Sequence, residues 1–331
     1  MVGFCTSPRF VEHLTGRNHP ERPDRIRAIT LAVWEAGLID SPNPFADFAI
    51  DLGLAPIGGD KLVEIEPVPA EEKLLELVHT PAEIHRVKQL CAAGGGALDE
   101  DTIVGPNSYE IALLACGAVL RCCDAVALGN VRRAFAAIRP PGHHAEPERP
   151  MGFCLFGNVA IAARYLQKQH GLEQIAIVDF DVHHGNGTQA AFEHDPSVLF
   201  VSLHQDPHTC YPGTGFAYEV GLDAGLGSTL NVPLPPGSGD AEYLQAFQSR
   251  VLPKLDLFKP QMLLLSAGFD AHRDDPLAQM ELSEDGFARI THLLVQAADV
   301  HSGGRIVSAL EGGYNLRALG RSVVAHLAAL R

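Results

Sequence analysis

Several features that mark other classes of protein are missing from these 331 residues. No apolar run approaches the roughly 20 residues needed to cross a bilayer, and the sequence contains neither a repeat nor a low-complexity tract. The seven cysteines form no CxxC pair and show no regular spacing, which argues against a disulfide framework. The first 13 residues lack a basic region followed by an apolar segment, so we expect them to belong to the mature protein. These absences predict a soluble, cytoplasmic protein with reduced thiols.

Basic residues are also scarce. The chain has 25 Lys and Arg against 40 Asp and Glu, which gives a formal net charge of -15. This balance argues against non-specific binding to nucleic acid or to an anionic membrane, and it favours cationic partners as much as it fits an ordinary cytoplasmic protein. With 46% apolar and 20% charged residues, the chain can bury a sizeable core and is not disordered.

Short apolar runs alternate with amphipathic segments along most of the chain. We expect strands at 134–138, 175–180, 198–203, 229–232, 262–266 and 306–310, and helices near 107–128, 157–169, 240–256, 284–300 and 316–330. This alternation predicts an α/β fold, with one domain over 1–331 and a mainly parallel sheet flanked by helices. The segment 37–60, rich in Pro, Gly and Asp, is expected to be a surface insertion.

Polar motifs stand at the ends of five of the six expected strands. They are RPPGHH (139–144), DFDVHH (179–184), SLH (202–204), SAGFD (266–270) and EGGYN (311–315). Parallel strands bring their carboxyl ends to one edge of the sheet, where open α/β proteins bind ligands. Five motifs at one edge therefore predict an active site.

Asp181, His183 and Asp270 are candidate metal ligands. Side chains alternate along an extended strand, so Asp181 and His183 should point the same way. Three oxygen and nitrogen ligands without cysteine are typical of a catalytic zinc site that keeps one position open. Such a metal would polarise a carbonyl and lower the pKa of a bound water molecule.

The pair His143-His144 and Tyr314 complete the predicted site. Two adjacent imidazoles suit general base and general acid work, because their ordinary pKa lies near 6.5, and Asp179 can hold one of them in its tautomer. The hydroxyl of Tyr314 can donate to the oxygen of a tetrahedral intermediate. Neither a GxSxG elbow nor a Walker loop is present, so the pattern predicts metal-assisted amide hydrolysis without a covalent enzyme intermediate.

Together these residues make the sequence resemble the zinc-dependent histone deacetylase family, in its class II and bacterial amidohydrolase branch. The matching motifs are RPPGHHAE (139–146), GFCLFGNVAIAAR (152–164), VDFDVHHGNGTQ (178–189), DPSVLFVSLH (195–204), YPGTG (211–215), LLLSAGFDAHRDDPL (263–277) and LEGGYN (310–315). Weaker similarity in HPERPDRI (19–26) extends the resemblance over nearly the whole chain. It implies an arginase-deacetylase fold with an eight-stranded parallel sheet.

Carried over residue by residue, the resemblance implies a role for each motif. One zinc ion per chain would be bound by Asp181, His183 and Asp270, protons would be transferred by His143 and His144, and the carbonyl would be polarised by Tyr314. Asp179 would partner His143, and Asn186 would stand behind His144, where class I members have an aspartate. We expect the amide to leave His144 less basic than an aspartate would.

The resemblance also implies a second ion and a tunnel for the acyl chain. A structural potassium ion would be held by Asp179, Asp181, His183, Ser202 and Leu203, partly through backbone carbonyls, and a second monovalent site would lie near Phe192 and Val198. The walls of an acyl-lysine tunnel would be formed by Gly152, Phe153, Tyr211 and Leu277. Tyr211 aligns where the family usually has phenylalanine.

We therefore expect a deacetylase that removes acetyl or other acyl groups from lysine in proteins or from small acylated amines. An acetylpolyamine amidohydrolase is the alternative: such enzymes can carry a glutamate where Leu277 stands, whereas the acidic surface suits a polyamine. Dinuclear hydrolysis of the arginase type would need carboxylates where Gly185 and His272 stand. A non-catalytic acyl binder would have lost a ligand or Tyr314, and none is missing. The sequence leaves the oligomeric state and the role of the 37–60 loop open.

Overall fold

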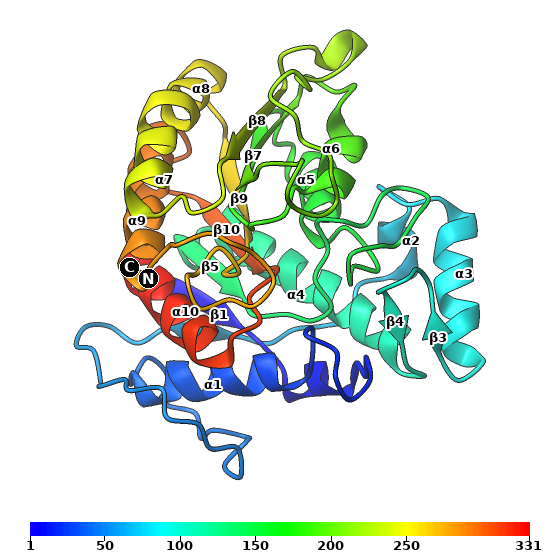
Figure 1. Cartoon of the computed structure of the whole chain (residues 1–331), viewed down its shortest axis with the longest axis vertical. Helices are drawn as coiled ribbons and strands as arrows, with labels where there is room; N and C mark the ends of the chain where they lie inside the picture. The colour runs from blue at the N-terminus through cyan, green and yellow to red at the C-terminus, as the bar shows by residue number, and fades with distance from the viewer.

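The computed structural model describes all 331 residues and is built around one large sheet with helices on both sides (Figure 1). Eight strands pair in parallel in the order β2-β1-β5-β10-β9-β6-β7-β8. The strands are β1 (Val2–Cys5), β2 (Val63–Ile65), β5 (Arg133–Ala136), β6 (Ile175–Asp179), β7 (Val198–Gln205), β8 (Thr229–Leu234), β9 (Met262–Ala267) and β10 (Ile306–Leu310). A small antiparallel ribbon, β3 (Gly96–Ala97) with β4 (Ile103–Val104), lies outside this sheet. The predicted eight-stranded parallel sheet is confirmed.

Ten α-helices connect and cover the strands. They are α1 (Asp24–Glu35), α2 (Glu72–Leu75), α3 (Pro81–Ala92), α4 (Ser108–Ala127), α5 (Asn158–His170), α6 (Asn186–Phe192), α7 (Asp240–Ala246), α8 (Leu252–Phe258), α9 (Glu284–His301) and α10 (Leu316–Leu330). Helices α1, α10 and α9 pack in a row along one side of the sheet, and α4 packs with α5 along the other (Figure 1). None of these helices is both long and apolar enough to cross a membrane.

The central strands are buried on both faces. Every residue of β6, β7, β9 and β10 is buried, because helices cover the sheet from both sides. This explains why these strands are continuous apolar runs in the sequence and do not alternate with polar residues. It also means that polar side chains come together only where the strands end.

Two helix caps fix the chain close to the strand ends. Asn315 caps α10, since its Oδ1 accepts the N–H of Ala318 at 3.1 Å, and this places the preceding Tyr314 at the start of a rigid helix. Ser283 caps α9 in the same way by accepting the N–H of Gly286. Both caps anchor loops that leave the carboxyl edge of the sheet.

The structure differs from the expected elements mainly in the first hundred residues. Strands β1 and β2 and helices α1 and α3 were not predicted, and the helix expected over 240–256 consists of α7, a π-helical turn at Phe247–Val251 and α8. The segment 37–60, expected as a surface insertion, contains neither helix nor strand, and it buries Leu38, Phe45 and Leu52 in the core.

Candidate active site

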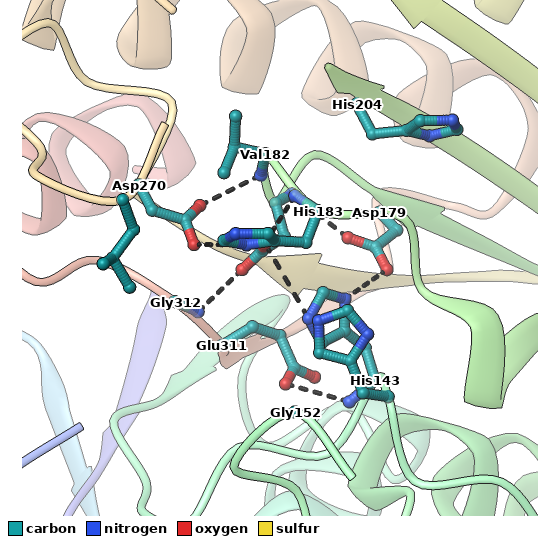
Figure 2. Close-up of polar contacts among 12 residues, drawn as sticks. His143, Gly152, Asp179, Val182, His183, His204, Asp270, Glu311 and Gly312 are labelled. Atoms are coloured by element: carbon teal, nitrogen blue, oxygen red, sulfur yellow. Dashed lines mark hydrogen bonds and ion pairs between the residues drawn. The ribbon is translucent and has the colours of Figure 1, made fainter. Parts of the chain in front are cut away.

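The five polar motifs follow neighbouring strands. Strands β5, β10, β9, β6 and β7 are adjacent in the sheet, and their carboxyl ends bring the motifs to one edge, as predicted. Figure 2 shows side chains from four of these strand ends pointing toward one another, with Asp270, His183, Glu311 and His143 within a single polar cluster. The site is therefore assembled from segments far apart in the sequence.

Asp181, His183 and Asp270 form a buried group whose ligand atoms all lie within 4.8 Å of one another. The Nδ1 atom of His183 lies 3.0 Å from Asp181 Oδ1 and 3.2 Å from Asp270 Oδ2. The remaining oxygens are held by the backbone: Asp181 Oδ2 accepts the N–H of Gly312, and Asp270 Oδ1 accepts the N–H of Val182. Two carboxylates and one imidazole, pre-oriented in this way, can hold one divalent metal ion.

The expected alternation of side chains along a strand is wrong as an explanation of this convergence. Asp181 and His183 do not share a face of a strand, because β6 ends at Asp179 and residues 181–183 form a bend. Asp181 Oδ1 accepts the backbone N–H of His183 at 2.9 Å, which is the local turn that aspartate favours. The two side chains meet through this turn, and strand alternation plays no part.

The two imidazoles of the His143-His144 pair lie 4.0 Å apart, measured between ring centres. Each has its own partner behind it: His143 Nδ1 lies 2.9 Å from Asp179 Oδ2, and His144 Nδ1 lies 2.7 Å from Asn186 Oδ1. The structure therefore brings together both histidine-partner pairs that the sequence predicts. His143 Nε2 lies 3.8 Å from Asp181 Oδ1.

The surroundings push the pKa values of the two histidines in opposite directions. Burial lowers the pKa of His143, but the carboxylates of Asp181 and Asp179 outweigh it and raise that pKa to about 10. Burial lowers the pKa of His144 well below its ordinary value, and the neighbouring His143 and His183 lower it further. These opposite shifts favour the charged form of His143 and the neutral form of His144, a separation that suits acid–base chemistry.

Tyr314 reaches the site from the loop between β10 and α10. Burial, together with the charge of Asp270, raises the pKa of its hydroxyl well above the ordinary value, so the hydroxyl stays protonated. Arg25 lies over its ring at 5.0 Å, and the ring of Phe153 packs edge-on at 5.8 Å. The preceding Gly312 comes so close to the metal-ligand group that an added Cβ would lie 1.9 Å from Asp270 Oδ2.

A cavity of about 200 Å³ opens over these residues. Its lining consists of Asp101, His144, Gly152, Phe153, His183, Tyr211, Leu277 and Tyr314. All four residues predicted to form the tunnel are present, and Tyr211 packs its ring against His144 at 5.1 Å. Gly152 is required at its position, because a Cβ there would lie 2.4 Å from His144 Cδ2.

Several residues around the site were not singled out from the sequence. Asp101 lines the cavity, and its carbonyl oxygen lies 2.9 Å from His19 Nε2. Glu311 Oε2 accepts the N–H groups of Gly142 and His143, and so ties the end of β10 to the histidine pair. Asp275 Oδ2 accepts the N–H of Tyr314 at 2.7 Å. Glu311 and Asp275 lie within recognised motifs and Asp101 lies outside them, but nothing in the spacing of these residues indicates their contacts.

Of the residues expected to bind potassium, Asp179, Ser202 and Leu203 lie in neighbouring strands of the sheet, whereas Asp181 and His183 lie in the bend that follows β6. Asp179 pairs with Ser202 across β6 and β7, and Leu203 follows in β7. Ser202 Oγ lies 2.8 Å from His204 Nδ1. Histidines outside the site are held by ordinary contacts: both ring nitrogens of His326, for example, lie within hydrogen-bonding distance of the hydroxyls of Thr291 and Ser308.

The chain is similar to several known proteins. Residues 19–330 match the family described as the histone deacetylase domain. A histone deacetylase-like amidohydrolase of Pseudomonas aeruginosa is 47% identical over 248 residues, which are 75% of this chain and 65% of that protein. A probable deacetylase of Archaeoglobus fulgidus is 39% identical over 317 residues, which are 96% of this chain and 82% of that protein.

The fold of this chain also matches that of a solved structure. The crystal structure of the HDA15 HD domain superposes with a TM-score of 0.88 at 36% identity, and the match covers 99% of this chain and 89% of that one. The arginase-deacetylase architecture expected from the motifs is thus found in a solved relative. The chain belongs to the histone deacetylase domain family.

Proposed function

We propose that this protein is a zinc-dependent amidohydrolase that removes acetyl or other acyl groups from side-chain amines of lysine or from small acylated amines. The observation that carries the proposal is the convergence of a metal-ligand group, a histidine pair and a tyrosine hydroxyl on one cavity. We place the reaction in the cytoplasm and assign no role to nucleic acid or membrane.

The metal ligands would be Asp181, His183 and Asp270. The donor set fits zinc: one imidazole and two carboxylates, with no cysteine, leave the fourth position open. When bound, zinc supplies Lewis acidity that polarises the amide carbonyl and lowers the pKa of water. The potassium ion expected at Asp179, Asp181, His183, Ser202 and Leu203 would have a structural role.

The proton is moved by His144. It is neutral and its Nδ1 is engaged by Asn186, so Nε2 accepts a proton from the attacking water and returns it to the leaving amine. His143 keeps its charge through Asp179 and stabilises the negative charge that develops beside it. The hydroxyl of Tyr314 donates to the carbonyl oxygen as that oxygen becomes anionic.

The cavity favours an acyl-lysine or a similar acylated amine. Phe153 and Tyr211 provide aromatic walls for a methylene chain, and Leu277 adds an apolar contact. A second positive charge on the substrate would meet no carboxylate at Leu277. Asp101 in the cavity wall and the net charge of -15 both favour a cationic polyamine as the alternative substrate.

The two other hypotheses, dinuclear hydrolysis and non-catalytic acyl binding, have less support. His272 stands where dinuclear hydrolysis needs a carboxylate, and its Nδ1 instead accepts the N–H of Asp274 at 3.1 Å. A non-catalytic acyl binder would not need the histidine pair with its two partners.

A substrate panel tests this proposal. The zinc-loaded protein is incubated with acetyl-lysine peptides, longer acyl-lysine peptides and acetylated polyamines, with a hydroxamate inhibitor as a control. Inhibitor-sensitive release of the acyl group from at least one class is expected. Turnover no faster than that of the Tyr314→Phe and His144→Ala variants on every substrate would overturn the proposal.

A further inference from the structure

A chain of two hydrogen bonds lies behind His144. Asn186, at the start of α6, accepts at Oδ1 from His144 Nδ1, which lies 2.7 Å away. Its Nδ2 donates to Glu146 Oε1, also at 2.7 Å. Glu146 lies two residues after His144 and is not part of the cavity lining. The side chains thus run from Glu146 through the amide to the imidazole.

The direction of the amide follows from hydrogen-bond chemistry. A carboxylate only accepts, so the NH₂ group of Asn186 faces Glu146 and its carbonyl oxygen faces His144. Neutral imidazole carries one N–H, and the carbonyl oxygen of Asn186 accepts it from Nδ1. Asn186 is the only hydrogen-bond partner of that nitrogen. Nε2 then has a free electron pair.

We propose that Glu146 is a positioning residue that, through Asn186, keeps the proton of neutral His144 on Nδ1 and leaves Nε2 free to act as the base. This inference rests on the proposed role of His144 in deacylation. It assigns a task to a glutamate that contacts neither the cavity nor the metal ligands.

The side-chain amide of Asn186 needs a partner that fixes its orientation, and a carboxylate would not. An aspartate at position 186 would accept from His144 whichever oxygen faced the ring, whereas an amide turned end for end would offer N–H groups and force the proton onto Nε2. The other neighbour of Asn186 Nδ2 is Met151 Sδ at 3.3 Å, a weak acceptor that cannot fix the direction. Glu146 itself is held by its backbone, which exchanges hydrogen bonds with Arg149.

The kinetic test compares Glu146→Leu, which has no acceptor, with Glu146→Gln, which keeps one. We expect kcat of Glu146→Leu to fall about 10–100-fold with little change in KM, the range found when a hydrogen-bond partner that orients a metal-binding side chain is removed. Glu146→Gln should keep most of the activity. Glu148→Leu is the matched control, because Glu148 is an exposed carboxylate of the same loop. Equal losses in Glu146→Leu and Glu148→Leu, or in Glu146→Leu and Glu146→Gln, would overturn the inference.

A double variant tests the coupling between the two positions. Asn186→Asp alone places two carboxylates together and should lower kcat. Glu146→Leu/Asn186→Asp should recover about tenfold over Glu146→Leu, because an aspartate accepts from His144 without a guide. A double variant no faster than Glu146→Leu would show that Glu146 does not act through Asn186.

The tautomer can also be observed directly. Long-range ¹H–¹⁵N correlation spectra of ¹⁵N-histidine-labelled protein, with His144→Ala for assignment, should show the Nδ1–H form in the wild type and a mixture or the Nε2–H form in Glu146→Leu. Unchanged spectra would overturn the inference even if the enzyme is active. Because the spectra need no substrate, a wild type without deacylase activity would count against the proposed function alone. Thermal unfolding confirms that Glu146→Leu is folded, and Glu146→Met replaces it if it is not.

Discussion

At the scale of single residues, the site depends on a layer of contacts behind the reacting groups. Tyr314 shows this most clearly, since its backbone N–H is held by Asp275 and its ring lies between Arg25 and Phe153. Each contact restricts the position of one hydroxyl. Removing that hydroxyl should therefore change the chemistry and leave the fold intact.

We expect Tyr314→Phe to lower kcat about 10²–10³-fold, because one donor to the developing oxyanion is lost. Zinc content and the urea midpoint should stay near wild type, since the hydroxyl has no hydrogen-bond partner within the protein. Tyr218→Phe is the control, because Tyr218 is 77% exposed. Wild-type turnover by Tyr314→Phe would remove Tyr314 from the mechanism.

Leu277 tests substrate choice. It is 38% exposed at the cavity, and a glutamate there could pair with the second charge of an acetylated polyamine. We expect Leu277→Glu to raise the ratio of kcat/KM for acetylpolyamine over acetyl-lysine peptide roughly tenfold, the value of a charge-assisted hydrogen bond of about 1.5 kcal/mol. Leu257→Glu on α8, where Leu257 is 80% exposed, adds the same charge to another surface. An unchanged ratio, or the same change in both variants, would count against Leu277 as the selective position.

At the scale of secondary structure, the sequence predicts the buried strands best. Strands β6, β7, β9 and β10 are mainly apolar runs followed by polar motifs, and each lies close to its expected bounds. Strand β2 has three residues and two of them are exposed, so it gives no apolar run to detect. Helix α1 was not predicted although its interior is apolar. The alternation of apolar runs and amphipathic segments, which predicts the other elements, begins only after residue 100.

The site was predicted less completely than its reacting residues. Strand order alone brings the motifs to one edge, and the motif letters name the ligands and the histidine pair. Glu146, Glu311 and Asp275 hold these groups through hydrogen bonds to residues 40, 169 and 39 positions away in the sequence. No local pattern reveals such contacts, so they required the folded chain.

Helix α6 packs its first turn directly on the histidine pair, and Gly187 makes this possible. An added Cβ would lie 2.4 Å from the carbonyl oxygen of Ala145, and this backbone cannot yield without moving His144. Alanine favours a helix by about 1 kcal/mol over glycine, but overpacking of this kind costs about 1–3 kcal/mol. We expect Gly187→Ala to lower kcat at least about tenfold and to lower the urea midpoint.

The control for that change is Gly58→Ala, since a Cβ at Gly58 meets no atom within 4 Å. Enzyme kinetics and urea unfolding are measured on both variants. If Gly187→Ala were as active and as stable as Gly58→Ala, the close packing of α6 on the histidine pair would have no functional consequence.

At the scale of the whole molecule, buried charges link distant parts of the chain. Glu21 accepts hydrogen bonds from Arg25 and Arg139, and all three side chains are fully buried. Burial raises the pKa of Glu21, but Arg139, followed by His13 and Arg25, outweighs it and lowers that pKa from 4.5 to about 2. The cluster joins the first helix to β5 and, through Arg25, to the carbonyl of Gly313.

This cluster predicts how stability depends on acid. A depressed pKa means that Glu21 binds its proton more weakly in the folded state than in the unfolded state. Glu21 therefore contributes fully to folding stability above pH 4.5, and this contribution is lost as the pH falls toward 2. The difference between the pKa of 4.5 and that of about 2 corresponds to about 3 kcal/mol of stability. Urea unfolding at several pH values should show Glu21→Gln less stable than wild type by about 3–5 kcal/mol at pH 7, because two buried guanidinium groups lose their partner. The difference in unfolding free energy between the two proteins should narrow below pH 4. A difference independent of pH would contradict the depressed pKa of Glu21.

The metal site is the other place where buried charge affects the whole molecule. Asp181 and Asp270 follow the ends of two adjacent strands at the centre of the sheet, and burial, together with repulsion from Asp181, raises the pKa of Asp270. A divalent cation bound between them would relieve this repulsion only in the folded chain, so it should stabilise folding by about 4 kcal/mol at a thousandfold excess over its Kd. We expect chelation to lower Tm by several degrees and added zinc to restore it. Asp270→Asn should abolish the zinc-dependent rise in Tm, whereas Asp223→Asn, which changes a carboxylate with 83% of its side chain exposed, should keep it. A rise of equal size in both variants would place the metal elsewhere in the protein.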